Sequence, residues 1–161
     1  MTIQKGDNLP DATLLKLGEG GPEQVELSSL TGGRAVLFAL PGAYTGTCTT
    51  QHVPSFIRTA DQFRDKGIEH IICVSVNDPF VMAAWAKDTG ADKAGLEFLA
   101  DADGSFTRAV GMEFDAPPAG LHGRSKRYAM LVDNGRVTAL NVEDSPGTCD
   151  LSGGEALLKD A

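Results

Sequence analysis

A short apolar run that ends at a Pro-Gly turn, with a cysteine just beyond it, constrains the fold of this chain more than any other feature. Residues 35–40 (AVLFAL) predict a buried strand, and Pro41-Gly42 marks its end. Residues 49–66 have the apolar spacing of a helix. Cys48 therefore lies between the end of a buried strand and the start of a helix, which predicts an α/β fold with a thiol at the strand–helix turn.

A cysteine at the start of a helix can be a nucleophile. The unpaired amides and the positive dipole end of the helix favour the thiolate over the thiol. The segment before Cys48, Tyr44-Thr45-Gly46-Thr47, is polar, so we expect the sulfur to be accessible to solvent. The alternative is a small buried hydrophobe, as free cysteines most often are. The polar segment favours a functional thiol.

The spacing around this cysteine resembles a known active-site motif. Pro41-x3-Thr45-x2-Cys48 is similar to the Pro-x-x-x-Thr-x-x-Cys motif of the peroxiredoxins. Segment 41–56 as a whole is most similar to the peroxiredoxin-5 (type II) subfamily, although many members have proline where this chain has Gly46, and glycine loosens a turn. The resemblance extends over nearly the whole chain, through Gly6-Asp7-x-Leu9-Pro10, residues 74–82 (VSVNDPFVM) and residues 127–133 (RYAMLVD).

Residue patterns elsewhere in the chain predict strands that alternate with helices and end in a hairpin, which indicates an α/β sandwich with a mixed sheet. Pro54 should kink the first helix. The other elements are expected as two short strands around a turn at 18–22, a strand at 69–76, a helix at 79–88, a strand near 96–100, a helix near 105–110, a hairpin of 127–132 and 136–142, and a helix near 154–159. The resemblance implies a single thioredoxin-like domain over residues 1–161, with a central mixed β-sheet flanked by helices and an N-terminal β extension.

The resemblance also implies a thiol-dependent peroxidase that reduces hydrogen peroxide and alkyl hydroperoxides without a cofactor or a metal. Cys48 attacks one peroxide oxygen and becomes a sulfenic acid, the first stage of thiol oxidation. Such a site has to stabilise negative charge that spreads over the two oxygens. The other implied site residues are Pro41 and Thr45 of the motif, Gly46 and Thr47 as substrate contacts, and Arg127 as the cation.

Two of these assignments have alternatives in the sequence. Arg127 could equally be a solvated strand end, and Arg124 and Lys126 are neighbouring cations, so its selection rests on the resemblance. His52 lies four residues after Cys48 and shares a helix face with it, which leaves open a Cys-His thiol hydrolase. We expect His52 instead to support the catalytic residues without acting as the general base. A third possibility is a non-enzymatic redox-sensing module with a thioredoxin-like fold.

Three routes can resolve the sulfenic acid. Cys149 lies in a polar segment rich in turn formers, and animal-type peroxiredoxin-5 places its resolving cysteine in a comparable loop. Cys73 lies in an apolar strand, where burial would raise its pKa and keep it unreactive, although a resolving role has been assigned to a cysteine at this place in plant-type members. We favour Cys149, ahead of an external thiol and with Cys73 third. Thioredoxin, glutaredoxin or glutathione is the expected reductant.

Composition limits the partners and the location. Acidic side chains outnumber basic ones by 22 to 14, and the net charge of −8 disfavours nucleic acid and anionic membrane surfaces as partners. No apolar run approaches the length of a membrane span, and the N-terminus lacks the pattern of a signal peptide. Three cysteines without a C-x-x-C pair suit a reducing cytoplasm. By resemblance we expect a homodimer, with Phe80 or its neighbours near the contact.

Overall fold

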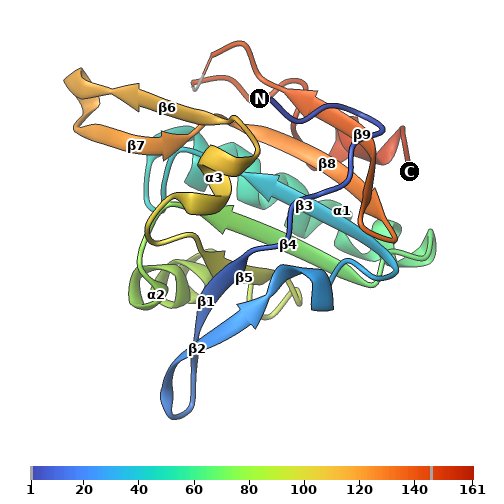
Figure 1. Cartoon of the computed structure of the whole chain (residues 1–161), viewed down its shortest axis with the longest axis horizontal. Coiled ribbons are helices and arrows are strands. Elements are labelled where there is room, and N and C mark those ends of the chain that lie inside the picture. The colour runs from blue at the N-terminus through green and yellow to red at the C-terminus, as the bar shows by residue number, and fades with distance from the viewer. Residues whose placement is uncertain (1, 146) are drawn as a thin grey trace.

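A central seven-stranded sheet organises the computed structural model of the chain, which describes residues 2–145 and 147–161. The strands follow the order β2-β1-β5-β4-β3-β8-β9 across the sheet (Figure 1). Their bounds are Thr13–Gly18 (β1), Gly21–Glu26 (β2), Arg34–Ala39 (β3), His70–Ser75 (β4), Glu97–Ala100 (β5), Tyr128–Asp133 (β8) and Arg136–Val142 (β9). A separate hairpin consists of β6 (Glu113–Ala116) and β7 (Leu121–Ser125). The helical elements are α1 (Val53–Asp65), α2 (Pro79–Thr89), α3 (Ser105–Ala109), α4 (Gly154–Leu158), the 3-10 turns Leu27–Ser29 and Pro117–Ala119, and the π-helical turn η2 (Cys48–His52).

The centre of the sheet is formed by β3, β4 and β8, whose side chains are almost all buried. β3 and β4 run parallel, with Phe38 opposite Cys73, whereas β3 and β8 run antiparallel, with Phe38 opposite Ala129. The sheet is therefore mixed, as the sequence predicted. The hairpin of β8 and β9 turns at Asn134 and Gly135, whose φ angles of 50° and 78° fit the short turn that an Asn-Gly pair favours.

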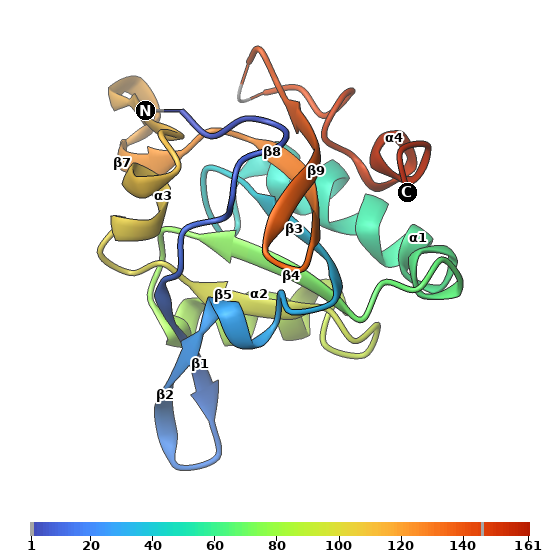
Figure 2. The ribbon, with the colours of Figure 1, turned by 45° about the vertical axis from the view of Figure 1, so that its right-hand side comes forward.

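Helices cover both faces of the sheet. On one face, Phe56 of α1, Trp85 of α2 and Leu157 of α4 belong to the same apolar cluster as Phe38 of β3. On the other face, Phe106 of α3 packs in a second cluster together with residues of the N-terminal segment. The last helix, α4, lies beside α1 (Figure 2). This is the predicted sandwich of helices and a mixed sheet, with β1 and β2 as the N-terminal extension.

The helix predicted at 49–66 is divided into two parts. The first part, η2, is a π-helical turn in which the Val53 amide donates to the Cys48 carbonyl, five residues back. α1 begins at Val53, so Pro54 lies in its first turn, where a missing N–H is tolerated. The irregularity expected at Pro54 therefore takes the form of a widened turn just before α1. Such π-helical turns occur frequently at functional sites.

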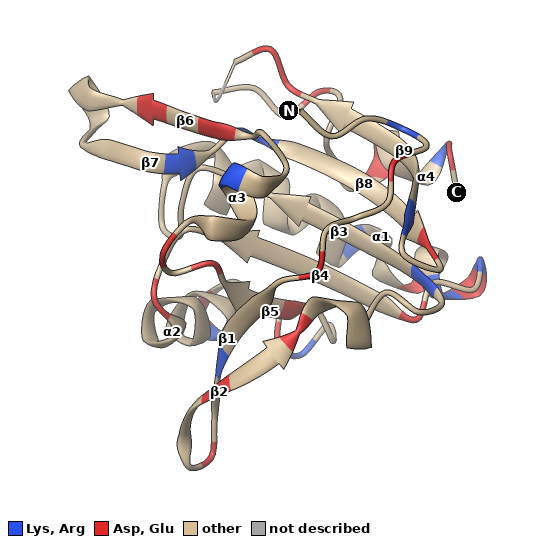
Figure 3. Ribbon diagram, in the orientation of Figure 1, with Lys and Arg blue, Asp and Glu red and all other residues tan. Residues whose placement is uncertain are grey.

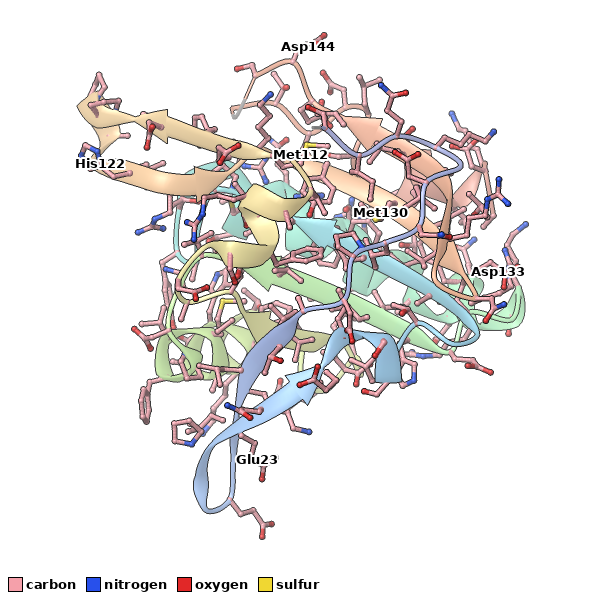
Figure 4. The ribbon with its side chains drawn as sticks, viewed as in Figure 1. Glu23, Met112, His122, Met130, Asp133 and Asp144 are labelled. Atoms are coloured by element: carbon pink, nitrogen blue, oxygen red, sulfur yellow. The ribbon has the colours of Figure 1, made fainter. Side chains whose placement is uncertain are left out.

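The hairpin of β6 and β7, which the sequence did not predict, extends away from the sheet (Figure 1). His122 is exposed near its outer end (Figure 4). Acidic residues lie on β6 and a basic residue, Arg124, lies on β7 (Figure 3). Arg124 donates to the Pro41 carbonyl at 3.2 Å. This bond ties the hairpin to the turn that follows β3.

Candidate active site

The turn between β3 and η2 is fixed by hydrogen bonds within it and to α2. The Thr45 hydroxyl donates to the Gly42 carbonyl at 2.7 Å, and the Thr45 carbonyl accepts from the Thr49 amide at 3.0 Å. Tyr44 has a φ of 63°, a left-handed conformation that is uncommon for a residue with a side chain. Its hydroxyl donates to Asp88 of α2 at 2.6 Å. The motif residues therefore lie on a constrained turn directly before the cysteine.

The predicted exposure of Cys48 is wrong. Its side chain has no solvent-exposed surface and belongs to the apolar cluster under α1. Tyr44 and Gly46, in the polar segment before it, are exposed as expected. The cysteine itself lies at the first position of η2, where Arg127 contacts its sulfur. The polarity of residues 44–47 thus indicates only their own exposure. It does not predict the exposure of Cys48, because the turn of η2 directs that side chain toward the core.

Arg127, which directly precedes β8, is the charged partner of Cys48. One of its guanidinium nitrogens donates to the Cys48 Sγ at 3.1 Å, and another donates to Nδ1 of His52 at 3.0 Å. Arg127 is only 2% exposed, so its charge acts close to the sulfur with little water between them. Arg124 instead contacts the preceding turn, and Lys126 is exposed. Of these three neighbouring cations, Arg127 is the one in hydrogen-bond contact with the sulfur.

His52 holds Arg127 in place. Its Nε2 is 2.9 Å from the Ser152 carbonyl, which can only accept, so Nε2 has the proton and Nδ1 accepts from Arg127. Burial, together with the positive charge of Arg127, lowers the pKa of His52 from 6.5 to about 3. The ring is therefore neutral near neutral pH and both of its nitrogens are occupied. It cannot take a proton from Cys48, which removes the general base that a Cys-His hydrolase requires.

A hollow of about 270 Å³ lies beside these residues. The turn after β3 and Arg127 contribute a partly polar side to it, and the β6–β7 hairpin contributes an apolar side. Its lining consists of Pro41, Thr45, Gly46, Thr47, Arg127, Gly147 and, from the hairpin and its connection, Phe114, Ala116, Ala119 and Leu121. The structure therefore brings the residues implied as substrate contacts around one space, and it adds the hairpin residues to them.

The other two cysteines have different surroundings. Cys73 lies within β4 with no exposed surface, and burial raises its pKa. Cys149 is half-buried in the loop between β9 and α4. Burial raises its pKa, an effect that the charge of Arg127 opposes. Cys48, Cys73 and Cys149 are all free thiols.

Glu143 and Ser152, which no pattern in the sequence indicated, connect the site to the Cys149 loop. The carbonyl of Ser152 holds His52, while its amide and hydroxyl both donate to Glu143. The residues that bind Glu143, Leu151 and Ser152, lie eight and nine positions after it, so no local pattern links them. The only sign in the sequence is that Glu143 is an acidic residue directly after an apolar strand. In the part of the chain that the structure describes, no group of three or more His, Cys, Asp or Glu side chains could hold a metal ion.

Comparison with known proteins gives the class of protein that this fold and site define. The Redoxin family model matches residues 4–158. Peroxiredoxin-2C of Oryza sativa subsp. japonica is 48% identical over 159 residues, which span 98% of this chain and 97% of the relative. The structure of reduced Prx3 from Vibrio vulnificus in complex with H2O2 has a TM-score of 0.89 at 46% identity, with 98% of each chain covered. Peroxiredoxin 5 from Alvinella pompejana has a TM-score of 0.83 at 33% identity, with 98% of this chain and 97% of that chain covered.

These matches define a redoxin-type fold with a cysteine site. Within that class, the chain belongs to the peroxiredoxins, and the likeness to peroxiredoxin 5 fits the type II subfamily inferred from its motif. The predicted family and the predicted thioredoxin-like fold are both confirmed. The protein is accordingly a thiol-dependent peroxidase.

Proposed function

We propose that Cys48 is the nucleophile that attacks peroxide and that Arg127 stabilises the negative charge of the reaction. The main support is the 3.1 Å contact between the Arg127 guanidinium and the Cys48 Sγ, beside the hollow that Arg127 lines. The Thr45 hydroxyl gives its proton to the Gly42 carbonyl, so its oxygen is the acceptor for a peroxide O–H. Pro41, Gly46 and Thr47 form the remainder of this side of the substrate site, and His52 positions Arg127.

The reaction transfers two electrons from sulfur to peroxide. The Cys48 thiolate attacks one peroxide oxygen, the S–O bond forms, and the O–O bond breaks. The leaving hydroxide or alkoxide takes up a proton and departs as water or alcohol, and Cys48 remains as the sulfenic acid. Negative charge is shared by both oxygens in the transition state, so a fixed guanidinium and the backbone amides around Thr47 and Cys48 stabilise that state. The apolar side of the hollow, with Phe114 and Leu121, provides space for the alkyl group of a hydroperoxide.

Substitution of Cys48 by Ser tests the nucleophile. The two side chains are nearly isosteric, so Cys48→Ser should keep the fold and abolish peroxidase turnover. The reduced wild-type protein is mixed with one equivalent of hydrogen peroxide and followed by intact mass and peptide mapping. Turnover that persists in the variant would assign the nucleophile to Cys73 or Cys149. Oxidation of wild-type Cys48 no faster than that of free cysteine would contradict the proposed site.

Cys149 is the proposed resolving residue. Its thiolate attacks the Cys48 sulfur, an S–S bond forms, and hydroxide leaves to become water. The loop that contains it is already in contact with the site, because the Thr47 hydroxyl donates to the Gly147 carbonyl at 3.1 Å and the Ser152 carbonyl accepts from His52. Thioredoxin, glutaredoxin or glutathione then supplies the two electrons that reduce the disulfide.

Non-reducing peptide mapping after one equivalent of peroxide tests the resolving step. The expected product is a Cys48–Cys149 disulfide. A stable sulfenic acid would favour the external thiol, and a Cys48–Cys73 link would overturn the assignment. Reduction of the oxidised protein by each candidate reductant, followed by the loss of the linked peptide, identifies the physiological class of thiol.

The protein is also proposed to be a homodimer through the surface around α2. Phe80 is 58% exposed and Tyr44 is 51% exposed, and exposed apolar side chains that gather in one patch mark protein–protein contacts. Both belong to one region, because the loop after β3 contacts α2 through the Tyr44–Asp88 bond and Asn77 through the Ala43 amide. Sedimentation at micromolar concentration should give a dimer for the wild type and a monomer for Phe80→Asp. A wild-type monomer would contradict the proposal.

A cytoplasmic location stays a prediction. Relatives at 47% and 46% identity in Arabidopsis thaliana are named chloroplastic and mitochondrial, respectively. Among residues 2–145 and 147–161, none of the helices has the length and apolar character needed to cross a membrane. Fractionation of the source cells, with antibody detection of the intact chain, tests the location directly.

A further inference from the structure

Glu143, the first residue after β9, has a carboxylate that binds the loop containing Cys149. The residue is only 8% exposed. One carboxylate oxygen accepts from the Leu151 amide at 2.8 Å, from the Ser152 amide at 2.5 Å and from the Ser152 hydroxyl at 2.6 Å. The other oxygen accepts from the Thr148 hydroxyl at 3.3 Å. The Thr148 hydroxyl also lies 3.0 Å from the Ser145 carbonyl, so its single proton is shared between two acceptors. The three firm donors to Glu143 therefore come from Leu151 and Ser152, directly after Cys149.

The loop that Glu143 binds is also attached to the peroxide site. The amide and the hydroxyl of Ser152 donate to Glu143, while its carbonyl accepts from Nε2 of His52. Nδ1 of His52 in turn accepts from Arg127. On the other side of Cys149, the Gly147 carbonyl accepts from the Thr47 hydroxyl at 3.1 Å. Figure 4 shows Asp144, the residue next to Glu143, at the outer edge of the molecule, where the loop begins.

The position of the Cys149 sulfur shows why the loop has to move. The Sγ lies beside Gly153, at a point that Ser55 of α1 also approaches. The Ser55 hydroxyl accepts from the Gly154 amide at 2.8 Å, which fixes this end of the loop to α1. Ser55 lies in the first turn of α1, seven residues after Cys48, which begins η2. Cys48 has no exposed surface, and Cys48 and Cys149 are both free thiols in this structure. A disulfide between them therefore requires a displacement of the loop.

We propose that Glu143 is a latch that holds the Cys149 loop in its reduced position, and that the loop has to leave this carboxylate before the disulfide forms. The inference rests on the proposed resolving role of Cys149. The chemical step itself is unchanged: the Cys149 thiolate attacks the Cys48 sulfenic acid, the S–S bond forms and hydroxide leaves. The two electrons have already gone to the peroxide. Glu143 is a positioning residue, which acts on the rate at which Cys149 becomes available.

The test uses Glu143→Gln and Ser152→Ala in the full chain. Glu143→Gln removes the charge from the acceptor, whereas Ser152→Ala removes one donor and leaves the carbonyl bond to His52 in place. Asp150→Asn is the matched control, because it removes one acidic charge from an exposed position of the same loop. Two quantities are measured: hydrogen exchange of the Leu151 and Ser152 amides in the reduced protein, and the rate of Cys48–Cys149 disulfide formation after one equivalent of hydrogen peroxide.

Glu143→Gln should raise both quantities about tenfold, because a hydrogen bond to a charged acceptor contributes about that factor to an equilibrium. Ser152→Ala should raise them by a smaller factor. Asp150→Asn should leave the amide exchange at the wild-type level, and any change in its disulfide rate measures the loss of an acidic charge beside Cys149. Unchanged exchange at Leu151 and Ser152, or a disulfide that forms at the wild-type rate or more slowly in both variants, would overturn the latch. If the wild type forms no Cys48–Cys149 disulfide, the resolving role of Cys149 fails. Increased exchange in the variants would still support the latch in that case, and unchanged exchange would still refute it.

Discussion

Replacement of Arg127 by Gln should slow the reaction of Cys48 with peroxide by about 10²–10³-fold, the loss seen when one donor to a developing negative charge is removed from an active site. Two unit charges at the observed 3.1 Å separation interact by about 5 kcal/mol at an effective dielectric constant of about 20. The measured loss should be smaller, because a Gln amide can still donate to either the sulfur or His52. Because Arg127 is almost completely buried, added salt should restore little of the lost rate in Arg127→Gln.

Trp85 provides the assay, since it is the only tryptophan and its indole N–H donates to the Thr49 hydroxyl at 3.1 Å. Thr49 is next to Cys48 in η2, so oxidation of the thiol should change the emission of Trp85. Stopped-flow fluorescence over a range of hydrogen peroxide concentrations then gives the second-order rate constant. Lys126→Gln is the matched control, because it removes the same charge from the preceding, exposed position. Its rate constant should stay within about twofold of the wild type, as expected for a screened surface charge.

Two results would refute this reasoning. If Arg127→Gln reacts at close to the wild-type rate while its fold is intact, the guanidinium does not stabilise the transition state. If Lys126→Gln is slowed as much as Arg127→Gln, the effect comes from the general positive field at the start of β8, and direct contact with the sulfur is not the cause.

Three further predictions concern single residues. The folded-state pKa of His52, about 3, lies below its value of 6.5 in the unfolded chain, so the unfolded state binds the proton first as the pH falls. The free energy of unfolding should therefore decrease by about 1.4 kcal/mol per pH unit between about pH 6.5 and pH 3 through His52, and urea titrations of His52→Gln should lack this contribution. Gly46→Ala should raise the free energy of unfolding by about 0.4–1 kcal/mol, because a Cβ at this position meets no atom within 4 Å, and a decrease would contradict it. Cys73→Ala should leave the peroxide rate constant unchanged, since that thiol is buried in β4, and any loss of disulfide formation on peptide mapping would return Cys73 to the mechanism.

The sequence predicted those parts of the fold that depend on neighbouring residues. The apolar runs of β3, β4 and β8 and the Asn134-Gly135 turn are local signals, and the structure confirms each of them. The hairpin of β6 and β7 was missed because the polar–apolar alternation of β6 lasts for only four residues and β7 (LHGRS) has none. Its pairing is supported instead by the bond from the Gly123 amide to Asp115 and by the Arg124–Pro41 contact.

The candidate site was predicted only in part for a related reason. The motif residues Pro41, Thr45 and Cys48 lie close together in sequence, and the family resemblance supplied Arg127. The burial of Cys48 could not be predicted, because it depends on a π-helical turn and on the guanidinium of Arg127, which lies 79 positions further along the chain. The link from Glu143 through Ser152 to His52 is a set of tertiary contacts, which no local pattern in the sequence indicates.

The pairing of β8 with β3 has a consequence for the newly made chain. Cys48 and Arg127 are 79 positions apart, and they meet only when β8 is in place beside β3. A nascent chain that has not yet reached β8 contains the thiol without the guanidinium, so its cysteine should be no more sensitive to peroxide than any unstructured thiol. Reactivity is thus acquired at a late stage of biogenesis. An unfinished or heat-unfolded chain is correspondingly shielded from oxidative damage at the residue on which its later activity depends.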